Sequence, residues 1–402
     1  MSGSASWRPD AGGPRTGMRP WRFVVWFGTI SLLADVVYEG ARSVTGPLLS
    51  SLGASALVVG VVTGAGEAAS LGLRLVSGRL ADRSGRFWEW SIAGYALTVA
   101  SVPPLGAVGV LWAACALVIA ERVGKAVRSP AKDTLLSHAT AAVGRGRGFG
   151  VHEALDQIGA LVGPLLVAGM LVLTGDAYGP TLAVLAVPGA AVLGLLLRLR
   201  ARVPEPAGYE HGTAGPGGAA AGARLPPAFW AYAGFTALTT AGFAGFGLLS
   251  FHLVRHGLLA TAWVPVLYAS AMAVDAVAAL ATGWAYDRLG PRVLVVLPLL
   301  TAAVPALAFT ERLGPAVAGS LVWGAALGVQ ESTLRATVAD LVGPGRRATA
   351  YGVFAAALGV ASLAGGALTG ALYGYSVPLL IAVVAAVQLL ALVLLAVTRR
   401  LR

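Results

Sequence analysis

Long apolar runs recur along the whole chain and decide what it can fold into. Hydrophobic residues make up 57% of the 402 residues, and charged residues make up only 12%. Soluble domains carry about 25% charged residues, so this chain lacks the charge to cover a surface in water. A helix of about 20 apolar residues crosses the hydrocarbon core of a bilayer. The runs do not alternate as barrel strands do, so we expect an all-α polytopic membrane protein.

Twelve segments of this kind can be placed along the chain. The first follows a polar, basic N-terminus and lacks a small-residue cleavage site, so we interpret it as a span rather than a removed signal peptide. The predicted spans are residues 22–50, 55–80, 88–104, 106–133, 148–174, 178–200, 228–254, 262–286, 291–310, 314–341, 346–373 and 375–398.

The positive charge indicates how the spans are oriented. The net charge is +11, but the cations lie in short loops rather than on one soluble face, so we expect no nucleic-acid partner. Twenty arginines lie in the termini and in the loops on one side, and only Arg255 and Arg312 lie in the loops on the other side. Cytoplasmic loops carry the excess of Lys and Arg, so both termini are predicted to be cytoplasmic. We interpret the bias toward arginine, alanine and glycine as bacterial genomic base composition, and we expect the membrane to be the bacterial plasma membrane.

The stretch 201–227 divides the chain, because it is rich in glycine, proline and alanine and has no apolar period. Such a composition is typical of a flexible linker. We therefore predict a cytoplasmic tail over 1–21, a six-helix bundle over 22–200, a cytoplasmic linker over 201–227 and a second six-helix bundle over 228–402.

The two predicted halves repeat each other. SGRLADRSGR (77–86) in the first half corresponds to TGWAYDRLGPR (282–292) in the second half, and further pairs follow in the same order. Internal repeats are typical of secondary transporters. The matching pairs are Gly78 with Gly283, Asp82 with Asp287, Arg83 with Arg288, Arg128 with Arg335, Asp133 with Asp340, Gly150 with Gly352 and Gly163 with Gly365.

The charged turn resembles the signature of the major facilitator superfamily. The resemblance covers twelve spans, a repeat of six plus six spans and a central linker, and it implies two pseudo-symmetric six-helix bundles. It also implies a cytoplasmic gate, in which Asp82 would contact the helix that starts near Arg346 when that side is closed. The alternative is a topology anchor made of arginines. The gate residues would be Gly78, Asp82, Arg83, Gly85, Arg86, Gly283, Asp287 and Arg288.

Span five resembles the antiporter motif of proton-coupled drug exporters of that superfamily. It contains Gly150, Gly159, Gly163 and Pro164, but Val167 and Ala168 replace the last two glycines of the motif. Ordinary helix packing with a proline kink is the alternative. ERVGKAVRSPAKD (121–133) and FGVHEALDQIGALVGPL (149–165) resemble a bacterial and archaeal subgroup, which indicates the class of mechanism but not the transported compound.

Several charged residues lie inside predicted spans, where a charge is costly and usually faces a cavity or a partner. Asp35, Glu39 and Arg42 share one face of span one, because they are spaced at i, i+4 and i+7. The resemblance implies that spans one, four, seven and ten line the cavity. Candidates for solute or proton contact are Asp35, Glu39, Arg42, Glu67, Arg122, Asp156, Glu331 and Arg335.

Asp35 or Glu67 is our first choice for a proton carrier, and Asp156 is the third. The alternative is a set of static ion pairs, such as Asp156 with Arg122 or Lys125. Aromatic residues gather in span seven, where they form either an apolar wall for the solute or filler that faces lipid.

No pattern of a catalytic site, a metal site or a nucleotide-binding loop is present. The sequence has no HExxH, no Cys/His ligand spacing and no GxxxxGK[ST], so we expect no enzyme activity, no metal and no cofactor. We predict a monomeric secondary transporter of a small organic solute, with proton-coupled efflux by antiport as the first interpretation. A proton-linked importer, a uniporter and a non-transporting membrane sensor or assembly protein are the alternatives.

Overall fold

The computed structural model describes residues 18–209, 225–343 and 346–400, and over these ranges its regular elements are all helices. Three short 3₁₀ turns are η1 (Pro206–Tyr209), η2 (Thr261–Trp263) and η3 (Gly290–Val295). The α-helices are α1 (Pro20–Ser51), α2 (Ala56–Ser84), α3 (Phe87–Leu105), α4 (Leu111–Val143), α5 (Arg145–Thr174), α6 (Tyr178–Ala183), α7 (Ala186–Arg202), α8 (Pro227–Ala241), α9 (Phe246–Arg255), α10 (Val264–Leu289), α11 (Val296–Ala308), α12 (Leu313–Leu341), α13 (Arg347–Tyr375) and α14 (Val377–Arg400).

The helices agree with the predicted class of fold. Nine segments of the described residues are long and apolar enough to cross a bilayer, and one of them, Thr261–Ala308, contains two predicted spans. The two remaining predicted spans correspond to α3 and α4, which are not among these nine segments. Helix α4 carries Glu121, Arg122, Lys125 and Arg128, which lowers its hydropathy. The all-α membrane class is confirmed, and the helices are consistent with twelve spans.

Two predicted spans are broken helices. The sixth consists of α6 and α7, and the seventh consists of α8 and α9 with Gly242 to Gly245 between them. The break exposes backbone polar groups that a continuous helix would pair. Backbone of this kind is tolerated at membrane depth where it is buried in protein or lines a cavity, and the residues at this break do line one, as described below.

Local sequence explains the ends of α2. The Ser55 hydroxyl accepts a hydrogen bond from the backbone N–H of Val58 at 3.3 Å, which caps the start of the helix. Gly85 follows its last residue with φ 64°, a left-handed conformation that glycine adopts without strain. The first charged turn therefore needs a glycine at this position.

Small residues let α5 lie close to α1. A Cβ atom built at Gly163 would lie 2.5 Å from the backbone oxygen of Val36, and one at Gly159 would lie 3.0 Å from the Cβ of Asp35. Gly150 has open space around it, and Pro164 lies inside the helix. Two of the three motif glycines in span five thus stand at the contact between α1 and α5.

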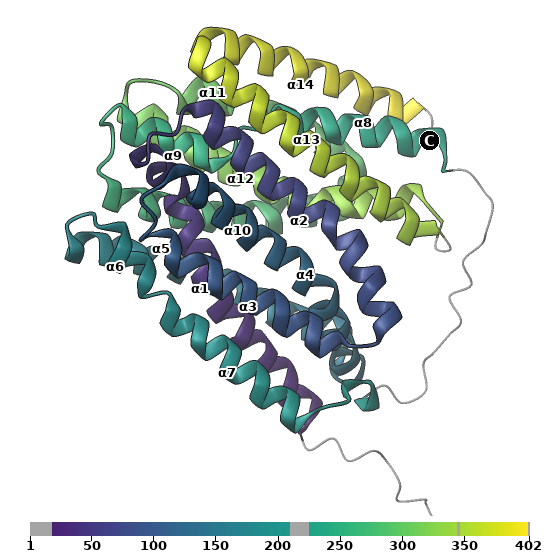
Figure 1. The fold of residues 1–402 in the computed structure, drawn as a ribbon. Helices are drawn as coiled ribbons and strands as arrows, with labels where there is room; N and C mark the ends of the chain where they lie inside the picture. Colours follow the sequence, from purple (N-terminus) through teal and green to yellow (C-terminus); the bar gives the residue numbers. More distant parts are fainter. Residues whose placement is uncertain (1–17, 210–224, 344–345, 401–402) are drawn as a thin grey trace, which may run out of the picture.

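Helices α2 and α13 lie side by side although they come from different halves of the chain (Figure 1). A Cβ atom built at Gly60 would overlap the backbone oxygen of Gly366, and the reverse is also true. A Cβ atom at Gly64 would lie 2.6 Å from the backbone oxygen of Ser362. The two helices can lie this close because the glycines have no side chains.

The apolar core is shared by the two halves at one end only. We call the end that holds the start of α1 and the last residue of α14 the arginine-rich end, and the other the opposite end. At the opposite end one cluster joins both halves, and it includes Leu48 and Val59 with Phe246, Tyr268 and Trp323. At the arginine-rich end each half has a cluster of its own. Among the described residues, the halves are therefore joined by apolar packing mainly at the opposite end.

The start of the predicted linker is packed against the first half. Helix α7 runs to Arg202, and the buried Tyr209 hydroxyl donates a hydrogen bond to the backbone oxygen of Met18 at 2.8 Å. The packed part thus continues beyond the predicted boundary at residue 200. Residues 1–17 of the predicted tail and 210–224 of the predicted linker lie outside the described residues.

We expect Gly60→Val to lower the thermal stability of the purified protein, because the new side chain would push α2 away from Gly366. Overpacking of this kind costs about 1–3 kcal/mol. Gly72→Val in the same helix is the matched control, since no atom lies within 4 Å of a Cβ built there. Equal melting temperatures of the two variants in detergent would contradict the close contact between α2 and α13.

Candidate functional site

A cavity of about 280 Å³ lies between the two halves of the chain. Its walls are the middle parts of α1, α2, α4, α12 and α13, together with the break between α8 and α9. Phe243, Phe246 and Trp323 line it and also contact the apolar cluster at the opposite end or belong to it. The cavity is therefore closed by apolar packing toward the opposite end.

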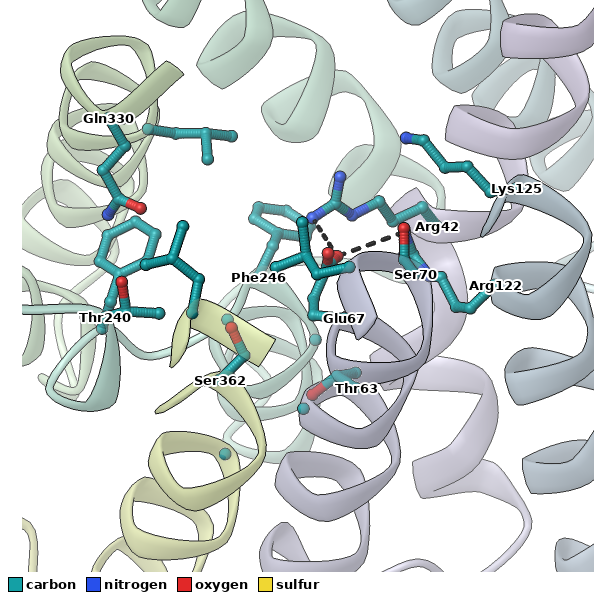
Figure 2. Close-up of a pocket in the computed structure, with 18 of the residues that line it drawn as sticks. Arg42, Thr63, Glu67, Ser70, Arg122, Lys125, Thr240, Phe246, Gln330 and Ser362 are labelled. Carbon is teal, nitrogen blue, oxygen red and sulfur yellow. Dashed lines mark hydrogen bonds and ion pairs between the residues drawn. The ribbon is translucent and has the colours of Figure 1, made fainter. Parts of the chain in front are cut away.

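Glu67 stands in this cavity between two arginines from other helices (Figure 2). Arg42 Nη2 of α1 and Arg122 Nη1 of α4 each lie 3.2 Å from the same oxygen, Glu67 Oε1. Arg122 Nε also lies 3.4 Å from the Oε2 of the buried Glu121. One carboxylate thus links α1, α2 and α4.

The buried Tyr38 contacts these cations. Arg122 donates a hydrogen bond to its hydroxyl, and Arg42 does so at 3.4 Å. Lys125 Nζ lies 3.9 Å and Arg122 Cζ 4.7 Å from the centre of its ring. A cation within about 6 Å of an aromatic face is attracted by the ring, so Tyr38 helps to hold three like charges in one place.

Most of the charged groups that line the cavity are cations. Four cations line it, namely Arg42, Arg74, Arg122 and Lys125, against the two carboxylates of Glu67 and Glu331. The Lys125 side chain extends toward the interior of the cavity (Figure 2). Glu39 and Glu121, beside the lining, also pair with Arg42 and Arg122, so the cations gather on one wall while the nearby carboxylates match them in number.

The second half of the chain lines the cavity with polar groups and aromatic rings. Gln330 Nε2 and Thr240 Oγ1 are buried and have no hydrogen-bond partner among the described residues. Glu331 of α12 lines the same wall, whereas the side chain of Arg335 lies outside the described part of the structure. Gln330, Thr240 and Glu331 thus make this wall partly polar.

Glu39 joins the two halves beside the cavity instead of lining it. The Tyr268 hydroxyl of α10 donates a hydrogen bond to Glu39 Oε2 at 2.5 Å, and Arg42 Nη1 lies 3.6 Å from Glu39 Oε1. The centre of the Tyr268 ring lies 4.7 Å from the centre of the Phe246 ring and 6.2 Å from that of the Trp323 ring. This group therefore adds a polar link between the halves to the apolar cluster at the opposite end.

The two other carboxylates predicted as proton carriers lie outside the lining of this cavity. Asp35 Oδ1 lies 3.9 Å from Arg128 Nη2. Asp156 Oδ2 lies 3.5 Å from Lys132 Nζ and 3.6 Å from His152 Nε2. Asp156 therefore pairs with Lys132, and our alternative pairing with Arg122 or Lys125 was wrong.

The gate turns lie at the arginine-rich end. Asp82 and Asp287 are exposed, and among the side chains that the structure describes neither forms an ion pair. The guanidinium carbon of Arg288 lies 3.7 Å from the centre of the Trp284 ring. Gly78 lies beside Pro130 of α4, and Gly283 has open space around it. The two turns thus differ in what surrounds them.

The aromatic residues of span seven are mostly interior. Phe243 and Phe246 line the cavity, and Phe229 and Phe235 are fully buried. Trp230 is 55% exposed. The lipid-facing alternative therefore holds for Trp230 and is wrong for the buried rings.

Sequence reasoning did not select several residues of the site. Tyr38 stands three residues after Asp35 and four before Arg42, so helical spacing alone could have placed it on the same face. Tyr268, Gln330 and Thr240 had no such signal, because they reach the site through the packing of the second half against the first. No group of three or more His, Cys, Asp or Glu in the described ranges could hold a metal ion.

Known proteins with similar sequences or folds agree with this architecture. An uncharacterised protein of Mycobacterium tuberculosis is 64% identical over 385 residues, which cover 95% of this chain and 94% of that protein. The crystal structure of the nucleoside transporter NupG is similar with a TM-score of 0.70 at 13% identity, over 94% of this chain and 98% of that one.

A bacterial homologue of the human lysosomal transporter Spinster, in an inward-facing and occupied conformation, gives a TM-score of 0.69 at 17% identity, over 96% of this chain and 97% of that one. At these identities the two structures show the fold alone. The family model of the Major Facilitator Superfamily matches residues 27–311 and 256–402. The chain therefore belongs to the Major Facilitator Superfamily, and it is a membrane transporter rather than an enzyme.

Proposed function

We propose that this chain is a proton-coupled secondary transporter of a small organic solute, and that it works by alternating access. The moving parts would be the two six-helix bundles over 22–200 and 228–402, with the cavity between them. The observation that carries the proposal is Glu67, a titratable carboxylate inside the cavity that is held by Arg42 and Arg122. Such groups inside a membrane usually mark a solute path or a proton relay.

The distribution of apolar packing supports alternating access. One cluster joins both halves at the opposite end, whereas each half has a separate cluster at the arginine-rich end. By the excess of cations in cytoplasmic loops, the arginine-rich end would face the cytoplasm of the bacterial cell. The structure would then correspond to an inward-facing state, in which the predicted contact of Asp82 with the start of α13 is not made.

Glu67 is the proton carrier that the geometry favours over Asp35 and Asp156. It lines the cavity, while the other two carboxylates pair with cations away from it. A proton on Glu67 would remove the charge that attracts both guanidinium groups. Protonation and solute binding would thus act on the same two arginines.

Two directions of coupling are compatible with this site. The partial antiporter motif of span five supports exchange of the solute for protons, and hence efflux. Cotransport is the second candidate, because a proton on Glu67 would free Arg42 and Arg122 for the solute at the same step. A thermal-shift screen of a metabolite and drug library at two pH values would identify the solute, and proton flux in liposomes would give the direction.

We expect Glu67→Gln to abolish solute-dependent proton movement in liposomes with an imposed pH gradient, to below about a tenth of the wild-type rate, the scale on which positioned proton-transfer groups act. The amide keeps the shape of the side chain but cannot carry the proton. Movement of the solute down its own gradient would remain. A pH-sensitive dye inside the liposomes and a labelled solute measure the two fluxes.

Glu89→Gln is the matched control, because Glu89 also pairs with an arginine, at 2.6 Å from Arg200, but on the exposed surface. Its proton flux should equal that of the wild type. If Glu67→Gln retained full coupling, Glu67 would be removed as the carrier, and Asp35→Asn would be the next variant to measure.

We expect Asp82→Asn to slow turnover by about tenfold without changing solute affinity, because it would weaken a charge-assisted contact made only when the arginine-rich end closes. Asp176→Asn is the control. Asp176 is exposed at the opposite end with φ 63°, a conformation that asparagine tolerates well. Equal turnover of both variants would show that Asp82 has no part in a gate.

A further inference from the structure

We propose that the solute is a small organic anion, and that its anionic group takes the place of the Glu67 carboxylate between Arg42 and Arg122. This inference rests on the proposed transport function and names the class of solute. In the structure Glu67 would act as an internal anion that occupies the binding site when the solute is absent.

The geometry of the two arginines supports this exchange. They come from different helices, α1 and α4, and both point to one oxygen, Glu67 Oε1, at 3.2 Å. Guanidinium groups bind carboxylates and phosphates with charge-assisted hydrogen bonds. A site built to hold one carboxylate between two arginines would also suit the carboxylate or phosphate of a solute.

The cations of the site favour an anion over other solutes once Glu67 is protonated or displaced. Glu39, Glu67 and Glu121 pair with Arg42 and Arg122, and Lys125 is a further cation of the lining. Lys125 forms no ion pair among the described residues, and its ammonium group packs on the Tyr38 ring. When Glu67 is protonated or displaced, Arg42, Arg122 and Lys125 face only Glu39 and Glu121 on this wall, so the wall attracts an anion and repels a cation.

The other side of the cavity fits the uncharged part of such a solute. Phe243, Phe246 and Trp323 offer apolar and aromatic surface. Gln330 and Thr240 lie on the same side and add polar groups beside the aromatic surface. A volume of about 280 Å³ restricts the cargo to a small molecule, since pockets for drug-sized ligands span about 300–1,000 Å³.

Binding of five small probes to the purified full-length protein tests the class of solute. Benzoate and phenyl phosphate are the anionic probes, and benzamide, phenol and benzylamine are neutral and cationic compounds of similar size. Isothermal titration calorimetry in detergent gives the affinities. We expect the two anions to bind at least about tenfold more tightly than benzamide or phenol, and benzylamine to bind most weakly.

Two variants locate the anion. Glu67→Gln removes the competing charge, so both anions should bind about tenfold more tightly. Lys125→Met removes a cavity cation and should weaken both by a similar factor. The matched controls are Glu89→Gln and Arg200→Gln, which delete the same charges from an exposed pair outside the cavity and should leave the affinities unchanged.

Three results would overturn the inference. In the first, benzylamine or the neutral probes bind more tightly than the two anions. In the second, neither anion binds to the wild type or to Glu67→Gln. In the third, the cavity variants and the surface controls change the anion affinities equally. A failure of the proposed function is distinguishable, because anions would then bind as expected while no solute moved with protons in liposomes. If a cationic or neutral solute moved with protons, the assignment of an anionic solute would be wrong, and the proposed transport function would still hold.

Discussion

The ion pairs of Glu67 with Arg42 and Arg122 are the interaction on which the site depends. A charge in the middle of a bilayer costs several kcal/mol unless it meets a partner or water, and here Glu67, together with Glu39 and Glu121, compensates Arg42 and Arg122. Removing one partner of such a group leaves the others uncompensated unless water or a bound anion takes its place. The network therefore keeps three helices in register and holds its cations at the cavity.

The remaining architecture differs between the two ends of the molecule. Apolar packing and the Tyr268–Glu39 hydrogen bond join the halves at the opposite end, while the arginine-rich end has no shared apolar cluster among the described residues. The break between α8 and α9 places Phe243 and Phe246 at the cavity wall. Closure at one end and polar lining at mid-depth are thus parts of one arrangement.

The sequence alone predicts the class of fold well, because the length and spacing of apolar runs depend only on the thickness of the bilayer. It also selects Glu67, Arg42 and Arg122, since charges inside apolar runs are conspicuous. It could not show that they meet, nor that Asp156 pairs with Lys132, because both facts follow from how α1, α2, α4 and α5 pack. Gln330 and Tyr268 were missed for the same reason, and the breaks in the sixth and seventh spans have no clear signal in the apolar pattern.

The glycine-lined contact between α2 and α13 has a consequence for motion. Side chains that interlock must change rotamer before two helices can shift, and each such change adds to a barrier. Gly60, Gly64 and Gly366 present bare backbone to the partner helix, so no side chain at these positions has to leave its place. We expect the two helices to tilt against each other along this line with little resistance, so that the rate of exchange between conformations is set by the polar and aromatic contacts elsewhere.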